Sequence, residues 1–206
     1  MRTDWVPVSA AALVTGATAL FVGAQLTPRP SGDGELLRLA GEHTDRSGIL
    51  AVLLTVAAIG LVIGMPSLFT LFQRQGFRTG LCAAVLLSVG AVLLAAFAQV
   101  LVVFRSLTVH DAVTPEAIAA VAGNGLQQSM LLGGFAVFYL GELLLALALL
   151  RARTTPVWVP WAFVLHVVCG PLGQAVLPQG WRGLGSVLMV AGFAGVAVAA
   201  NQQGRG

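Results

Sequence analysis

The sequence predicts an all-α protein, a polytopic transmembrane helical bundle of about six spans with both termini in the cytoplasm. Composition is the first observation, because 57% of the 206 residues are hydrophobic and only 9% are charged. A soluble domain carries about 25% charged residues, so a soluble chain of this composition would have too little polar surface. The apolar residues also form runs of about 20, which is the length that crosses a bilayer as a helix. The third observation is that most arginines fall between these runs.

Six apolar runs are long enough to be spans, and the segments between them are too short to hold a soluble domain. We therefore expect one transmembrane domain over residues 1–206, with spans at about 6–26, 49–72, 79–104, 127–150, 157–177 and 183–200. The apolar part of the first span has about 20 residues, longer than the roughly 7–15 of a secretory signal, so we expect an uncleaved helix. Tryptophans favour the membrane–water interface, and all four lie at predicted span ends: Trp5, Trp158, Trp161 and Trp181.

Short turns join the second span to the third and the fourth span to the fifth, and both turns are basic without any acid. They contain Arg74, Arg78, Arg151 and Arg153. The longer connections at 27–48 and 105–126 mix acidic with basic residues. Short basic loops remain in the cytoplasm, so the two turns and both termini are predicted inside and the longer connections outside.

The second long connection contains a predicted short helix between residues 114 and 125. Thr114 suits the N-cap position, Pro115 suits the first helical position, and Gly123 suits the stop. Such a helix would lie at the outer end of the bundle.

The charged residues and cysteines exclude several function classes. All eleven basic residues are arginine, so no lysine is present to form a Schiff base such as that of retinal. The net charge is only +3 and the arginines are spread over the loops, so nucleic acid is not an expected partner. Cys82 and Cys169 differ in depth by about 13 Å along their helices, which is too far for a disulfide. No cluster of ligands predicts a metal or another cofactor.

Glu142 is the only acidic residue inside a predicted span. It precedes Arg151 by nine residues, which corresponds to about 13.5 Å of helix, and half of the hydrocarbon core measures about 15 Å. The carboxyl group is therefore expected near the bilayer midplane, where ionisable groups usually face the bundle interior and serve a function. Burial at this depth favours the protonated acid unless a cation or several donors lie close.

His166 is the only histidine inside a predicted span, and it lies nine residues after Val157. The short turn makes the fourth and fifth spans antiparallel neighbours, so His166 and Glu142 reach the same depth. Spacing does not determine the rotation of either helix, and the sequence leaves open whether the two side chains face each other.

Further residues on these helices could complete a site. Tyr139 is one turn from Glu142, while Pro171 frees a backbone carbonyl group near His166. The candidate catalytic residues are Glu142, His166 and Tyr139. The candidate pocket residues, which share a helix face or a depth with them, are Phe135, Phe138, Thr15, Thr18, Gly170 and Gln174.

Two segments of the first half carry a family resemblance: GELLRLAGEHTDRSGILAVLLTVAAIG and LFTLFQRQGFRTGLC. In hydropathy and in a few polar positions they resemble the bacterial multi-pass proteins of the DUF4386 family of unknown function. The resemblance implies a compact helical bundle in a bacterial plasma membrane. In architecture the chain is also similar to the small membrane-embedded terpene cyclases, which use intramembrane carboxyl groups as acids. Only Glu142 matches such an acid.

Three functions remain open. The first is a membrane-embedded enzyme acting on an apolar, isoprenoid or lipid-like small molecule, with protonated Glu142 as general acid and His166 setting its proton state. The second is a proton-coupled transporter or exporter of a small molecule. The third is an accessory subunit in which the Glu142–His166 pair only joins two helices. Membrane lipid surrounds the protein in each case, and the third function adds a membrane-protein partner or a second copy of the chain.

Overall fold

A computed structural model describes residues 5–27, 44–72, 75–110, 112–122, 124–176 and 183–204. Within these residues the chain is all-α, as the sequence predicts. The long helices are α1 (Trp5–Leu26), α3 (Thr44–Phe69), α4 (Phe77–Val109), α6 (Gly125–Ala152), α7 (Trp158–Val176) and α8 (Leu184–Gln203). A short helix α5 (Pro115–Ala122) precedes α6, and a 3-10 turn η1 (Thr70–Phe72) follows α3.

Five of the long helices have the length and apolar composition needed to cross a membrane, namely α1, α3, α4, α6 and α8. The apolar part of α7, Trp158–Gly173, is shorter, and α7 packs between α6 and α8. Many large apolar side chains on these helices are exposed, including Val52, Leu132 and Val168. Since lipid is the solvent that accepts such a surface, the chain is a multi-pass membrane protein.

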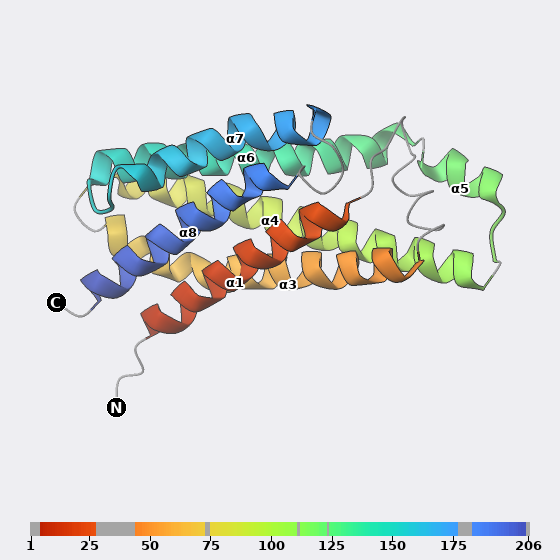
Figure 1. Cartoon of the computed structure of the whole chain (residues 1–206), viewed down its shortest axis with the longest axis horizontal. Coiled ribbons are helices and arrows are strands. Elements are labelled where there is room, and N and C mark those ends of the chain that lie inside the picture. The colour runs from red at the N-terminus through yellow and green to blue at the C-terminus, as the bar shows by residue number, and fades with distance from the viewer. Residues whose placement is uncertain are drawn as a thin grey trace.

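Each long helix packs mainly against two others, so the six form a closed ring in the order α1, α3, α4, α6, α7, α8 and back to α1. Consecutive helices run in opposite directions (Figure 1). The start of α1, the end of α8 and the α6–α7 turn lie at one end, which we call the terminal end, while α5 lies at the other, the α5 end. Near the terminal end η1 contacts α3, α6 and α8, and its Leu71 and Phe72 are buried.

The α1–α3 contact depends on glycine at the crossing point of the two helices. A Cβ atom on Gly16 would lie 2.6 Å from the backbone nitrogen of Leu61, and one on Gly60 would lie 2.8 Å from the Cα atom of Gly16. The two backbones therefore touch without intervening side chains, the close approach that small residues permit in membranes.

The ends of α3 and α4 extend beyond the predicted spans. The helix α3 begins at Thr44 rather than near residue 49, and Arg46 in its first turns donates from Nε to the carbonyl oxygen of Leu26 at 2.7 Å. This bond satisfies a free carbonyl group at the end of α1. The helix α4 continues through polar residues to Val109, because a helix does not need apolar residues once it leaves the hydrocarbon region.

The local helix signals behave as predicted. Thr114 accepts a hydrogen bond from the backbone N–H group of Ala117 at 3.4 Å, and Pro115 is the first residue of α5. The exposed Trp5 and Trp158 are the first residues of α1 and α7. Gly123 and Trp181 lie outside the described residues. The start of α1 and the end of α8 share one end, as six antiparallel helices require, while the side of the membrane that this end faces stays a prediction.

Candidate functional site

Glu142 and His166 face each other across the α6–α7 contact. Glu142 is fully buried and His166 is 4% exposed. The His166 Nδ1 atom lies 2.7 Å from the Glu142 Oε2 atom, so one hydrogen bond joins them, with its proton on one atom or the other. The two residues thus lie at the same level, as helix spacing predicts. The structure also gives the rotation of each helix, which spacing does not provide.

The second carboxyl oxygen of Glu142 is buried and has no hydrogen-bond partner among the residues that the structure describes. Most buried polar atoms in folded proteins are hydrogen-bonded, because an unpaired one loses its hydration without compensation. A pair that only joined two helices would be more stable with both oxygens satisfied. This oxygen of Glu142 can accept one more hydrogen bond.

Tyr139 and Gly170 complete the immediate surroundings of the pair. The Tyr139 ring lies 5.6 Å from the His166 ring, centroid to centroid, at an interplanar angle of 56°. A Cβ atom on Gly170 would lie 3.2 Å from His166 Nε2 and 3.5 Å from the Tyr139 hydroxyl oxygen. Gly170 therefore leaves room for both side chains at this level of α7.

The helix α8 supports this site from behind. A Cβ atom on Gly185 would lie 2.8 Å from the Cα atom of Gly170, so the backbones of α7 and α8 touch there. One turn before His166 on α7, the buried Phe163 ring packs edge-on against Phe193 with centroids 4.9 Å apart. The α7 residues that contact α8, Phe163 and Gly170, share a helix face with His166, so this packing helps to fix the position of His166.

Phe138 and Phe135, two of the other predicted pocket residues, have surroundings that do not include the pair. Phe138 is buried, but it packs against Gly90 of α4, where an added Cβ atom would meet the Phe138 Cβ atom at 2.9 Å. Phe135 is 38% exposed on the outside of α6. Gln174 is part of α7, and its side chain lies outside the described part of the structure.

Thr15 and Thr18 do not join the pair. Both are exposed on α1, which packs mainly against α3 and α8, and the Thr18 hydroxyl group donates to the carbonyl oxygen of Val14 at 2.8 Å. The Gly16 face of α1 turns towards α3. The threonines consequently face outward.

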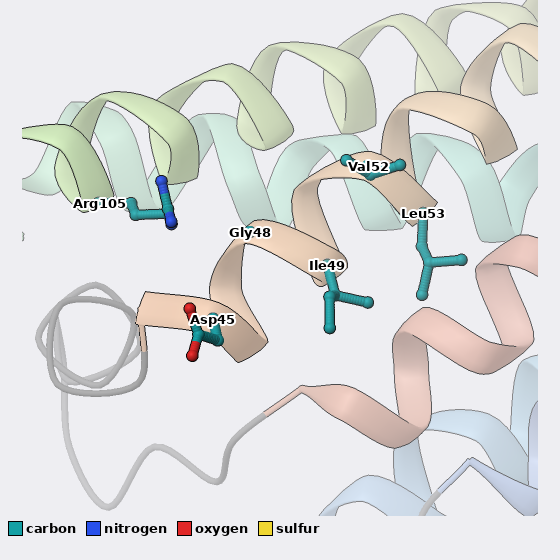
Figure 2. A pocket seen from close by; sticks show the side chains of 6 residues that line it. All are labelled: Asp45, Gly48, Ile49, Val52, Leu53 and Arg105. Carbon is teal, nitrogen blue, oxygen red and sulfur yellow. The ribbon is translucent and has the colours of Figure 1, made fainter.

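A pocket that the sequence reasoning missed lies between α3 and α4 at the α5 end (Figure 2). Its volume is about 560 Å³, and it is lined by Asp45, Gly48, Ile49, Val52, Leu53 and Arg105. The available signal was an acid just before one apolar span and a base just after the next, since consecutive antiparallel helices bring these two ends together.

No group of three or more His, Cys, Asp or Glu side chains in the described residues is arranged to hold a metal ion. Cys82 and Cys169 are both free and exposed.

Comparison of the chain with protein-family models, with curated proteins and with solved structures gave no match. The resemblance to the DUF4386 family and the architectural similarity to terpene cyclases therefore remain predictions from the sequence.

Proposed function

We propose that the protein is a proton-coupled transporter of a small organic cation in a bacterial plasma membrane, with Glu142 and His166 as its proton-binding pair. One observation carries the proposal: a fully buried carboxyl group holds His166 through one oxygen and leaves the other oxygen without a partner among the described residues. This arrangement suits a closed state in which the site holds a proton and is shielded from both sides of the membrane.

Charge accounting supports an exchange of proton for cation. With one shared proton the pair is neutral overall, either as acid and neutral imidazole or as carboxylate and imidazolium. Loss of that proton leaves a net charge of −1 in the hydrocarbon region, which is costly. Admission of a cation or of water would offset this cost, and both require the helices to separate.

The α6–α7 contact is where such a separation is easiest. Among the described residues it is the least extensive contact between neighbouring helices of the ring. Pro171 lies inside α7 and removes one backbone hydrogen bond there, with Gly170 and Gly173 beside it. The α7 helix can therefore bend close to His166 while its first half stays in place.

Proteoliposomes loaded with a pH-sensitive dye test the proposal. An acidic lumen is imposed, and a panel of small organic cations is added outside. We expect the wild type to alkalinise the lumen on addition of a transported cation. We expect Glu142→Gln, which keeps the shape of the side chain but carries no exchangeable proton, to lose this response.

The control is Glu116→Gln on the exposed surface of α5, which should transport like the wild type. Equal rates for the wild type and Glu142→Gln would contradict the proposal. The proposal would also be contradicted if no cation in the panel caused the wild type to alkalinise the lumen.

Acid catalysis on an apolar small molecule is the second candidate. The position of Tyr139 and its neighbours on α6 favours it, because they separate Glu142 from lipid by a single layer of side chains. Tyr139 is partly buried beside His166, and its neighbours Leu140 and Leu143 are exposed on the lipid-facing side of α6. A lipid-like molecule would need to cross only this layer to reach Glu142. Conversion of an isoprenoid substrate by the wild type but not by Glu142→Gln, without proton flux, would favour this function over transport.

A further inference from the structure

The pocket between α3 and α4 is separate from the Glu142–His166 pair and lies at the edge of the membrane. Ile49, Val52 and Leu53 begin the apolar part of α3, while Arg105 follows the apolar part of α4. The pocket therefore spans the boundary between the hydrocarbon region and the polar interface, the depth at which lipid headgroups lie.

Two opposite charges line this pocket on either side of Gly48 (Figure 2). A Cβ atom on Gly48 would lie 3.2 Å from Arg105 Nε, so the absence of a side chain there lets the guanidinium group approach the backbone of α3. Arginine binds phosphate oxygens through paired hydrogen bonds. The carboxylate of Asp45 is exposed, and a carboxylate can accept hydrogen bonds from an ammonium group.

The rest of the wall is apolar and faces lipid. Ile49 is 55% exposed and Val52 is 63% exposed. They continue from the charged part of the pocket along α3 towards the membrane interior. An extended hydrocarbon chain that starts near Arg105 would cover these two side chains.

We infer that this pocket binds a phospholipid with a primary-amine headgroup. Its phosphate contacts Arg105, its ammonium group contacts Asp45, and one acyl chain lies along Ile49 and Val52. The inference is independent of the transport proposal. It distinguishes three common headgroups: phosphatidylethanolamine matches both charges, phosphatidylcholine has no N–H group to donate to Asp45, and phosphatidylglycerol has no cation.

Native mass spectrometry of the detergent-purified full chain tests the inference, with the three lipids carrying identical acyl chains. We expect phosphatidylethanolamine to bind the wild type about tenfold more tightly than phosphatidylcholine, as the loss of one charge-assisted contact implies. In Asp45→Asn the affinity for phosphatidylethanolamine should fall to that for phosphatidylcholine. In Arg105→Gln all three lipids should bind more weakly.

The matched control is Arg151→Gln at the terminal end, where Arg151 donates to Thr79; its lipid affinities should equal those of the wild type. Equal binding of the three lipids by the wild type would overturn the inference, as would an unchanged preference in Asp45→Asn. A preference for phosphatidylglycerol would overturn it too, because that lipid needs only Arg105. If Arg105→Gln does not fold, the exposed substitution Asp45→Asn still decides the outcome.

Discussion

At the scale of single residues, the packing of His166 and Tyr139 beside Glu142 depends on the lack of a side chain at Gly170. The His166 and Tyr139 side chains occupy the space next to the Gly170 Cα atom. Glycine in a helix interior costs up to about 1 kcal/mol relative to alanine, so its presence here needs a local reason. The reason is space: an added methyl group would be 3.2 Å from His166 Nε2, and one of the two groups would have to move.

Gly170→Ala should therefore gain little or nothing in stability despite the better helix propensity of alanine. The comparison is Gly133→Ala on α6, where an added Cβ atom has no neighbour within 4 Å among the described residues. That substitution should stabilise the protein by up to about 1 kcal/mol. Thermal unfolding of both variants in detergent measures the difference. Equal stabilisation by the two substitutions would show that the space beside His166 is not tight.

At the scale of secondary structure, the α1–α3 pair shows what hydropathy can and cannot reveal. The existence of both helices follows from their apolar runs, and all six long helices fall close to their predicted ranges. The close crossing at Gly16 and Gly60 is a finding of the structure. The face that each helix turns to its neighbour does not follow, because lipid and protein interior are equally apolar and the helices carry no clear polar stripe. This is why Thr15 and Thr18 were assigned to a pocket that they do not reach.

Gly16→Ala should destabilise the α1–α3 contact. Its methyl group would lie 2.6 Å from the Leu61 backbone nitrogen, and backbone atoms cannot move aside as a side chain can. Overpacking of this kind costs about 1–3 kcal/mol. The control on the same helix is Gly23→Ala, whose nearest neighbour is the flexible Leu50 side chain at 3.4 Å. If denaturant unfolding gave the same midpoint for both variants, the crossing would not depend on direct backbone contact.

At the scale of the whole molecule, the helices close into a ring in which the first and last helices touch. Alternating direction and the positions of the arginines predict both termini at one end, and the structure places the start of α1 and the end of α8 at one end (Figure 1). Arg78, Arg151 and Arg153 lie near this end. The closure itself was not predictable from sequence, because the contact between α1 and α8 joins segments that no motif or spacing relates. The pocket at Arg105 differs in this respect, because the positions of Asp45 before one span and Arg105 after the next indicate that the two residues lie at the same end of neighbouring helices.

Reporter fusions test which side of the membrane the terminal end faces. A fluorescent protein that folds only in the cytoplasm should be active when fused after residue 204. Alkaline phosphatase, which folds only outside, should be active when fused after residue 112, because the positive-inside rule places the α5 end outside. The reverse pattern at both positions would mean that the bundle is inserted with the opposite orientation.

The order of the helices along the ring also has a consequence for biosynthesis. Helices enter the membrane in the order in which the ribosome supplies them, so α6 inserts Glu142 before α7 delivers the imidazole that pairs with it. The carboxyl group must cross the insertion machinery alone, and it does so at lower cost as the neutral acid. The ring then stays open on one side until the final helix arrives. Assembly therefore has two late events in a set order, first the pairing of acid and base and then closure by the C-terminal helix.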